Sequence, residues 1–370
     1  MGISQDDPVV DAALAEKTEE FVGQLFMAGL GGFEVLNVYV GDRLGLYRLL
    51  ADGRSVTTAE LADSARIHER YAREWLEQQA AAGVLEVDDA AAASADRRYS
   101  LPAAHAEALA NPESPFSIAP LARTLVSSAQ TLPKLLDAYR SGGGVDWSDY
   151  GDDMIESQGD FNRPWLVGQF GTEILPGIPD VHERLSADPP ARVLDVASGV
   201  GWSAITLAKA YPKATVDAFD PDEQSIEIGR RTADEQGVGD RVRFEARDGA
   251  SIGTEGPYDL AVVIEAIHDL ARPVETLTAI REALAPGASL LVADERVGEE
   301  FTAPADEIDR FMYAVSTMVC LPAGMADEPS AATGTVMRPS TLREYATQAG
   351  FENVEVLPFE PGFLRFYRLS

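Results

Sequence analysis

The sequence of 370 residues contains a single cysteine, Cys320, and four histidines. One cysteine excludes an intramolecular disulfide framework, and one cysteine with four scattered histidines gives no pattern of zinc ligands. Hydrophobic residues make up 45% of the chain, which is ample for a packed core. We therefore expect two domains or one large domain, stabilised by the core and without a metal ion.

Basic residues are also scarce, with 30 lysines and arginines against 61 aspartates and glutamates and a formal net charge of −31. This acidity disfavours nucleic acid and anionic membranes as partners. It indicates either a solvated acidic surface or adaptation to a salty cytoplasm, in which salt screens the self-repulsion. The first residues, MGISQDDPVVDAALAEK, lack the basic segment of a signal peptide. A cytoplasmic location is expected.

One apolar run, residues 21–40, is long enough to span a bilayer. Gln24, Glu34 and Asn37 within it are costly in lipid, and no basic residues flank its ends. We expect two helices joined at the glycines of residues 29–32 and buried against a partner subunit, as in a homodimer.

The pattern of residues 1–110 predicts three helices followed by a hairpin. Residues 33–51 are amphipathic, Thr57 or Thr58 can cap the second helix, and Gly83 follows the third. The runs VLEV and RRYSLP predict the hairpin. This order looks like a winged helix, a module that often binds DNA. Residues 1–150, however, carry 12 basic and 23 acidic residues, whereas a DNA-reading domain needs a basic face.

Residues 111–164 are expected to form a helical linker. Within them, residues 141–164 are turn-rich and acidic, with aromatic side chains at Trp147, Tyr150 and Phe161. Such a segment is more often functional or disordered than neutral. A mobile lid and a plain linker both remain open.

Residues 191–201, ARVLDVASGVG, predict a strand ending at Asp195, then a glycine-containing turn that opens a helix. Glycines let backbone amides approach a ligand, and the helix N-terminus offers unpaired N–H groups. Four later strands end in acids, at Asp220, Asp248, Glu265 and Asp294. In a doubly wound parallel sheet these ends share one edge, where ligands bind. The pattern predicts a nucleoside site there.

The turn reads D-x-A-x-G-x-G rather than the G-x-G-x-x-G that cradles a pyrophosphate, with Ala204 in place of the third glycine. A ligand without phosphate is therefore favoured, and Asp220 is suited to accept both ribose hydroxyls. Near the C-terminus, Glu360-Pro361-Gly362 joins two β-rich runs in a hairpin. We expect an α/β fold, a Rossmann-like seven-stranded doubly wound sheet with a reversed last strand.

Residues 165–370 thus resemble the class I S-adenosylmethionine-dependent methyltransferases. The resemblance implies that the cofactor's methionine end meets the glycine turn, and that Asp220 binds the ribose and Asp248 the adenine amino group. Glu265 either holds the ammonium, through its carboxylate or its backbone, or contacts the substrate alone. Ala197 stands where glycine is commoner, which requires a negative φ there. The implied cofactor residues are Asp195, Ala197, Gly199, Gly201, Asp220, Pro221, Asp248, Gly249 and Glu265.

The whole chain is similar to plant-type and bacterial small-molecule O-methyltransferases, in which the winged helix serves dimerisation. In that group a His-Asp pair after the fourth strand supplies a general base, which matches His268-Asp269. Asp294 is the implied orienting acid. Strand alternation predicts that its neighbour Glu295 faces away from His268. The group's second orienting acid is replaced here by Val336 or Met337.

The helix that follows the fifth strand lies, by the same resemblance, over the substrate pocket, with Met312 and Ser316 as contacts. The implied acceptor is a hydroxyl of an aromatic or polyketide-like small molecule. Carbon or nitrogen methylation would use the same cofactor site. A winged-helix regulator that senses S-adenosylmethionine without turnover is the alternative of another class.

Overall fold

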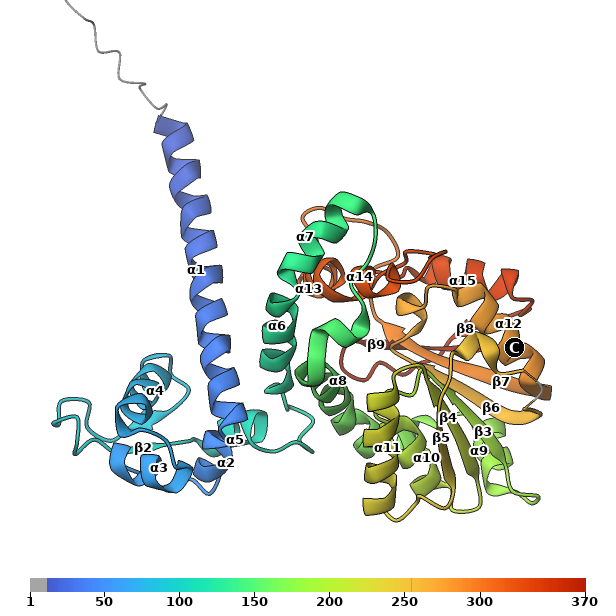
Figure 1. Cartoon of the computed structure of the whole chain (residues 1–370), viewed down its shortest axis with the longest axis horizontal. Helices are drawn as coiled ribbons and strands as arrows, with labels where there is room; N and C mark the ends of the chain where they lie inside the picture. The colour runs from blue at the N-terminus through green and yellow to red at the C-terminus, as the bar shows by residue number, and fades with distance from the viewer. Residues whose placement is uncertain (1–11, 254) are drawn as a thin grey trace, which may run out of the picture. The chain divides into compact units, whose positions relative to one another are not determined.

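The computed structural model describes residues 12–253 and 255–370, so the acidic start, residues 1–11, lies outside the described residues. The chain divides into two compact units, residues 1–111 and 112–370 (Figure 1). The finer division expected above, with a linker over residues 111–164, stays a prediction. Each unit is described in turn.

The first unit has the element order of a winged helix. Its elements are α1 (Ala12–Arg43), α2 (Leu46–Leu50), α3 (Thr58–Ala65), α4 (Glu69–Ala81), β1 (Glu86–Val87), β2 (Tyr99–Ser100) and α5 (Ala103–Leu109). Thr57 and Glu60 form a reciprocal capping box at the start of α3. The strands β1 and β2 pair in antiparallel. Buried Leu46, Trp75 and Leu76 belong to the core of this unit.

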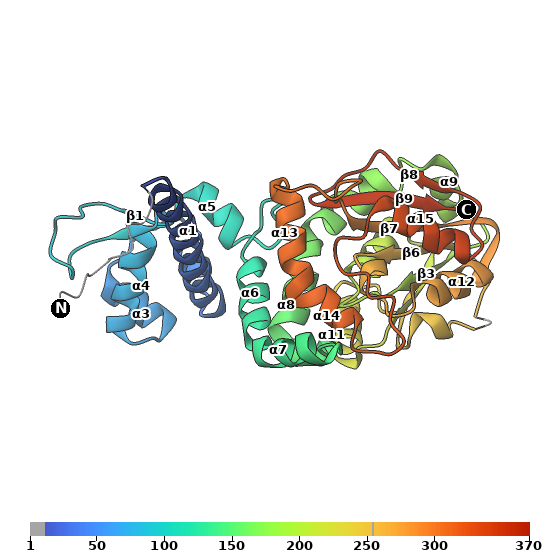
Figure 2. The ribbon, with the colours of Figure 1, turned by 90° about the horizontal axis from the view of Figure 1, so that it is seen from above.

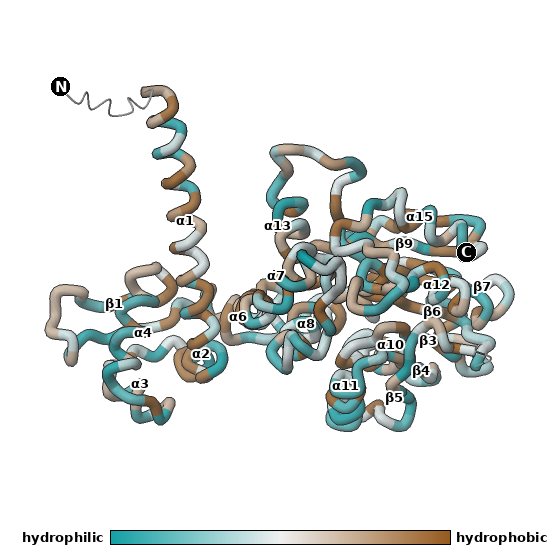
Figure 3. The backbone as a smooth tube through the Cα atoms, turned by 45° about the horizontal axis from the view of Figure 1, so that its top comes forward, coloured by the Kyte–Doolittle hydropathy of each residue, from teal (hydrophilic) through white to brown (hydrophobic). Residues whose placement is uncertain are grey.

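Helix α1 is continuous, so the expected break at residues 29–32 is wrong. Each glycine inside a helix costs about 1 kcal/mol relative to alanine, so the three glycines lower the stability of the helix without requiring the chain to turn. Phe26 and Phe33 are 70% and 71% exposed on α1, whose apolar residues are brown in Figure 3. By length and composition alone, α1 is the one helix among residues 12–253 and 255–370 that is suited to cross a membrane.

The second unit contains one seven-stranded sheet. Its strands are β3 (Arg192–Val196), β4 (Thr215–Asp220), β5 (Val242–Ala246), β6 (Tyr258–Ile264), β7 (Leu284–Glu295), β8 (Val354–Val356) and β9 (Leu364–Leu369). The strand order is β5-β4-β3-β6-β7-β9-β8. Strands β3 to β7 pair in parallel, and β9 pairs with β7 in antiparallel. The predicted fold class, with its reversed last strand, is confirmed.

Helices cover both faces of this sheet (Figures 1 and 2). One hydrophobic core contains Leu185, Ile205 and Ile226, from α9, α10 and α11. The other contains Ile280 and Leu342, from α12 and α15. The helices of the sheet region are α9 (Pro179–Ser186), α10 (Trp202–Ala210), α11 (Glu223–Glu235), α12 (Pro273–Ala283) and α15 (Pro339–Gln348). The chain winds in opposite directions from β3, so β3 and β6 flank the topological switch point.

Further helices of the second unit surround the sheet region. They are α6 (Pro120–Gln130), α7 (Leu132–Ser141), η1 (Trp147–Tyr150), α8 (Gly151–Trp165), η2 (Leu166–Ile174), α13 (Glu307–Val315), η5 (Ser316–Cys320) and α14 (Leu321–Gly324). The segment expected to be an irregular lid or linker is helical from Trp147 onward. Asp146 caps η1 by accepting from the Ser148 N–H at 2.9 Å, and Tyr150 donates to the Met318 carbonyl at 2.9 Å.

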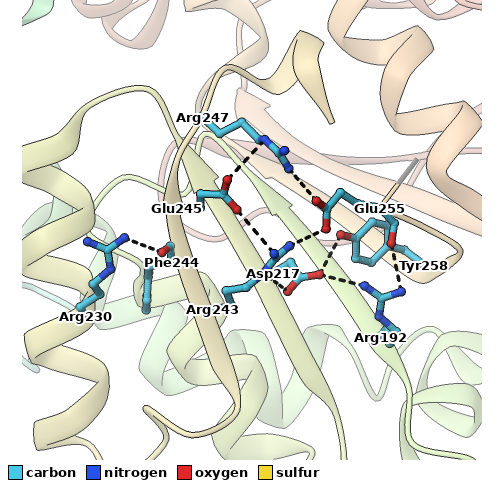
Figure 4. Close-up of polar contacts among 9 residues, drawn as sticks. All are labelled: Arg192, Asp217, Arg230, Arg243, Phe244, Glu245, Arg247, Glu255 and Tyr258. Carbon is cyan, nitrogen blue, oxygen red and sulfur yellow. Dashed lines mark hydrogen bonds and ion pairs between the residues drawn. The ribbon is translucent and has the colours of Figure 1, made fainter. Parts of the chain in front are cut away.

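A network of ion pairs stabilises the loop that follows β5 (Figure 4). Arg243 bridges Asp217 on β4 and Glu255 in the loop, at 2.9 and 2.8 Å. Arg247 also contacts Glu255, at 3.2 Å, and Tyr258 donates to Asp217 at 2.7 Å. The hydrogen bonds from Arg243 and Arg247 lower the pKa of Glu255. The network therefore holds both ends of the loop that begins at Asp248.

Candidate functional site

A cavity of about 460 Å³ opens in the second unit at the carboxyl ends of β3, β4 and β6. This is the switch point at which doubly wound sheets bind ligands. Predicted site residues that line the cavity are Ala197, Gly199, Gly201, Asp220, Pro221, Asp248 and Glu265. Predicted site residues outside its lining are Asp195, Gly249, His268, Asp294, Met312 and Ser316. The sheet edge thus brings together most of the predicted cofactor residues.

The turn after β3 gives backbone access to the cavity. Gly199 and Gly201 have φ of 52° and 81°, a region that glycine occupies without strain. Ala197 has φ of 55°, so the expected negative φ is wrong. The left-handed conformation costs a non-glycine residue about 1–2 kcal/mol, and the next residue, Ser198, donates its N–H to the Phe219 carbonyl at 3.0 Å. Sheet pairing therefore overrides the local preference.

The glycines of the site have different amounts of space around them, and this distinguishes a glycine that gives ligand access from glycines that permit close packing. A Cβ on Gly199 would meet nothing within 4 Å, whereas one on Gly201 would lie 2.3 Å from the Phe244 ring. A Cβ on Gly249 would clash with Val196 and Thr276. Gly199 thus leaves the site open, while Gly201 and Gly249 permit close packing of the elements behind it.

Two buried carboxyl groups lie behind and beside the turn. Asp195 is 1% exposed and accepts from the Ser203 hydroxyl, while its Oδ1 has no hydrogen-bond partner. Asp220 accepts from the N–H groups of Gly199 and Asp222 at 2.8 and 2.9 Å. Burial raises the pKa of Asp195 to about 7 and that of Asp220 to about 6. Carboxyl groups kept in so costly a position are typical of functional sites.

The raised pKa of Asp195 leads to a stability prediction. The pKa of Asp195 is higher in the folded chain than the usual value of about 3.9. Protonated Asp195 therefore contributes its full stabilisation of the folded state below pH 4, and this contribution is lost as the pH rises through about 7. Asp195→Asn removes the ionisation and still accepts from Ser203. At pH 8 we expect its free energy of unfolding to exceed that of the wild type by about 2–4 kcal/mol, measured by denaturant unfolding.

The same denaturant unfolding at pH 5 should show a much smaller gain in the free energy of unfolding. Asp188→Asn is a matched control, because the side chain of Asp188 is 74% exposed. A gain for Asp195→Asn that is equal at pH 5 and pH 8, or absent at both, would contradict the assignment of the buried charge.

Glu265 directly follows β6 in a strained conformation, with φ of 51°. Its Oε2 accepts from the side-chain amides of Gln158, at 3.1 Å, and Asn162, both on α8. Asn162 in turn accepts from the Trp165 indole at 2.8 Å. Sequence reasoning missed Gln158 and Asn162, because their segment was interpreted as lid or linker. The sequence signal that could have identified them is the i,i+4 spacing of two side-chain amides within an otherwise acidic stretch.

His268 lies in the short helix η4 (Ile267–Asp269), is 2% exposed, and is surrounded by acids. Its Nδ1 is 2.8 Å from Asp294 Oδ1 and 2.9 Å from Glu295 Oε2. Its Nε2 is 3.3 Å from Asp269 Oδ1. The predicted pairing of His268 with Asp294 is present. The prediction that Glu295 faces away is wrong, because β7 ends at this residue and strand alternation ends with it.

The charges of this cluster are coupled. Burial acts to lower the pKa of His268, but the neighbouring charges of Asp269, Glu295 and Asp294 outweigh it and raise that pKa well above its ordinary value. Burial raises the pKa of Glu295, whereas His268 lowers that of Asp294 despite its burial. The cluster therefore favours a positive charge on the imidazole of His268 and a negative charge on Asp294.

Asp269 links this cluster to the cavity, because it lines the cavity while His268 does not. Cys320 is buried nearby, with its sulfur close to His268 and Asp269. Met312 and Ser316 are buried instead of facing the cavity, and Ser316 Oγ accepts from the Thr335 N–H at 3.1 Å. The cavity is also lined by residues to which sequence reasoning assigned no role. These include Trp147, Ile155, Leu270, Ala323 and Asp327.

Two family models match the chain. The model described as a methyltransferase domain matches residues 173–356. The model described as an Rv2258c-like winged HTH domain matches residues 33–111. Together they cover six of the seven strands of the sheet, from β3 to β8, and most of the first unit.

Solved structures of similar architecture cover nearly the whole chain. The mitomycin 7-O-methyltransferase MmcR has a TM-score of 0.69 at 21% identity, over 97% of this chain and 99% of that one. PigF, solved with SAH, has a TM-score of 0.69 at 21% identity, over 95% and 99%. Human N-acetylserotonin methyltransferase, solved with SAM, has a TM-score of 0.66 at 16% identity, over 100% and 99%. At these sequence identities, the structural similarity shows a shared fold.

Curated relatives match shorter stretches. The release factor glutamine methyltransferase of Chlorobaculum tepidum is 43% identical over 81 residues, which are 21% of this chain and 27% of the relative. The trans-aconitate 2-methyltransferase of Streptomyces coelicolor is 29% identical over 139 residues, 38% and 43% respectively. The chain thus spans less than half the length of these relatives. With the sheet topology and both family models, the matches establish that the chain belongs to the class I S-adenosylmethionine-dependent methyltransferases with an N-terminal winged-helix domain.

Proposed function

We propose that the protein transfers a methyl group from S-adenosylmethionine to a hydroxyl oxygen of a small aromatic or polyketide-like molecule, with His268 as general base. The observation that carries the proposal is the buried His268–Asp294 pair, 2.8 Å apart, one residue from a cavity at the topological switch point. Nitrogen or carbon acceptors that ionise readily would not need such a base.

The residues present fit the cofactor. Gly199 leaves its backbone open to the cavity, Asp220 offers a carboxylate to two ribose hydroxyls, and Asp248, which lines the same cavity, would accept from the adenine amino group. The Glu265 carboxylate, oriented by Gln158 and Asn162, is suited to the methionine ammonium, and Asp195 supports the turn from behind. When bound, S-adenosylmethionine supplies an electrophilic methyl group on a sulfonium.

The chain's own residues would then manage the acceptor proton. The acceptor oxygen would take the methyl group, and the electron pair of the carbon–sulfur bond would stay on sulfur. The hydroxyl proton would pass by way of Asp269, which lines the cavity, to the unprotonated Nε2 of His268, 3.3 Å from Asp269 Oδ1. It would leave by way of Asp269 once the products have gone. Asp294 orients the imidazole and balances its charge. The products are a methyl ether and S-adenosylhomocysteine.

Calorimetric titration with S-adenosylmethionine and S-adenosylhomocysteine tests the cofactor, and release of S-adenosylhomocysteine in the presence of a panel of phenols tests the reaction. Micromolar binding followed by phenol-dependent release would support the proposal. Binding without release from any hydroxyl, amine or carbon acceptor would favour a sensor. Because residues 1–150 are predominantly acidic, we expect no shift of DNA fragments in gels.

We further propose that α1 makes the protein a homodimer, located in the cytoplasm. Burying one phenylalanine side chain contributes about 1.5–3 kcal/mol, and Phe26 and Phe33 are both mostly exposed in the single chain. The double substitution Phe26→Glu, Phe33→Glu should therefore weaken dimerisation at least about 100-fold. Analytical ultracentrifugation measures the effect.

The control for this prediction is Gln24→Glu, which adds charge to the same helix at an exposed polar position and should leave the dimer intact. A monomeric wild type would contradict dimerisation through α1. Sedimentation of the wild type with lipid vesicles would indicate that the apolar face binds a membrane instead.

A further inference from the structure

Asp294 and Glu295, adjacent residues at the end of β7, both reach the same ring nitrogen of His268. Asp294 Oδ1 is 2.8 Å and Glu295 Oε2 is 2.9 Å from His268 Nδ1. The three side chains are buried, with exposed fractions of 2% for His268 and Asp294 and 8% for Glu295. Two neighbouring carboxyl groups that have lost their water cannot both ionise without a large cost. The pairing of His268 with Asp294 accounts for only one of these two acids.

The two carboxylate oxygens of Asp294 have unequal surroundings. Oδ1 is bonded to His268 Nδ1 at 2.8 Å and accepts from the backbone N–H of Glu295 at 3.0 Å. Oδ2 is buried and makes no hydrogen bond to any residue within 12–253 and 255–370. A buried oxygen of this kind has lost its hydrogen bonds to water without a replacement. Asp294 Oδ2 therefore lacks a donor.

Glu295 Oε2 is in a similar position. It is buried and forms no hydrogen bond with any of the described residues, because the nitrogen that lies 2.9 Å away is bonded to Asp294 instead. The polar atoms of His268, Asp294 and Glu295 come within 4.8 Å of one another. One proton on Glu295 would satisfy both oxygens, since a carboxylic acid O–H donates and a carboxylate oxygen accepts.

The electrostatics of the two acids support the same arrangement. Burial raises the pKa of Glu295 well above its ordinary value. Burial also acts to raise the pKa of Asp294, but the charge of His268 outweighs it and lowers that pKa. Glu295 is therefore the acid that keeps a proton more readily. Carboxyl groups that lie side by side and cannot both ionise are known to share one proton in this way.

We propose that Glu295 is a positioning residue that shares one proton with Asp294, donating its O–H to Asp294 Oδ2 and so holding the Asp294 carboxylate against His268 Nδ1. The inference rests on the proposed function, because it concerns how the general base is oriented. With both oxygens bonded, Asp294 keeps His268 Nε2 toward Asp269, which lines the cavity. The acid pair then carries one negative charge, which balances the charge that His268 gains with the acceptor proton.

Infrared difference spectroscopy tests the shared proton without any ligand. The spectrum of the wild type minus that of Glu295→Gln, both at pH 8, should contain the C=O stretching band of a protonated carboxylic acid. Other buried acids, such as Asp195, are present in both proteins, so their bands cancel. The control difference uses Glu300→Gln, which removes an exposed acid from the loop after β7, and should lack the band. Absence of the band from the first difference overturns the shared proton.

Turnover tests the positioning role. Glu295→Leu removes the donor, so kcat with an accepted phenol should fall at least about ten-fold, as for the loss of one hydrogen bond to a charged group. KM and the affinity for S-adenosylhomocysteine should not change. The amide of Glu295→Gln can still donate to Asp294, so this variant should keep kcat within about three-fold of the wild type. Glu300→Leu is the matched control and should leave kcat unchanged.

A double-mutant cycle separates positioning from a purely structural role. If Glu295 acts through Asp294, Glu295→Leu should have little further effect on kcat in an Asp294→Asn background. An equal loss in both backgrounds, or a Glu295→Gln variant as slow as Glu295→Leu, would overturn the positioning role. The infrared difference needs only the conservative variant, so it decides the shared proton even where Glu295→Leu does not fold.

Failure of this inference can be told apart from failure of the proposed function. If S-adenosylhomocysteine does not bind the wild type, or no hydroxyl acceptor is methylated, the proposed function fails and the positioning role fails with it. The infrared difference still decides the shared proton in that case. If the wild type methylates a phenol and Glu295→Leu is as fast, only the role of Glu295 is overturned.

Discussion

Replacing His268 with alanine is expected to lower turnover by about 10² to 10⁴-fold, the range typical of a lost general base, while S-adenosylmethionine binds almost as before. The imidazole lies outside the cavity lining and contacts acids on both ring nitrogens, so its removal leaves the cofactor contacts in place. Single-turnover rates with an accepted phenol, together with calorimetric titration of the cofactor, measure the two effects separately.

The pH profile adds an independent readout. Because neighbouring carboxylates raise the pKa of His268, the wild-type rate should increase as the pH rises and the imidazolium loses its proton. His268→Ala should lose this dependence. The control His105→Ala removes a histidine of the first unit that contacts the Val84 carbonyl, and it should keep both rate and profile. Unchanged turnover in His268→Ala would end the assignment of the general base.

Asp220→Ala should have the largest effect on cofactor binding, raising the dissociation constant about 10² to 10³-fold. The physical reason is the loss of two hydrogen bonds from ribose hydroxyls to a charged acceptor, each worth about 1.5–3 kcal/mol. The Gly199 N–H donates to Asp220 at 2.8 Å, so the substitution also removes the acceptor of this backbone group. Calorimetric titration with S-adenosylhomocysteine measures the change without interference from turnover.

Acidification should have a related effect in the wild type. Burial raises the pKa of Asp220 to about 6, so below pH 6 the carboxyl binds a proton and loses acceptor capacity. Cofactor affinity should therefore fall as the pH drops through 6, whereas Asp220→Asn should bind weakly with less dependence on pH. Asp240→Asn, at an exposed position, is the control. Wild-type affinity in Asp220→Ala would contradict the ribose role.

The sheet and its acidic edge were predictable because each feature repeats along the chain. Parallel strands bring their carboxyl ends to one edge, so Asp220, Glu265 and Asp294 lie there whatever the helices do. The pairing of Ile264 with Ala293 across β6 and β7 places the segments after these strands side by side, which explains the contact between His268 and Asp294.

The features that sequence reasoning missed depend on contacts between distant segments. Glu295 turns toward His268 where the strand ends and alternation no longer applies. Ala197 adopts a positive φ because the next N–H pairs with β4, which no local propensity encodes. Gln158 and Asn162 reach Glu265 from a helix whose sequence is typical of a loop. In each case tertiary packing overrides the local signal.

The single thiol of the chain has a practical consequence. Cys320 is buried, and burial raises the pKa of its thiol to about 12, so the reactive thiolate is nearly absent at neutral pH. A cysteine introduced at a surface position would therefore react with maleimide dyes selectively, without prior removal of the native residue. Fluorophores attached in pairs, one to each unit, would report distances between the units by energy transfer in the otherwise unmodified protein.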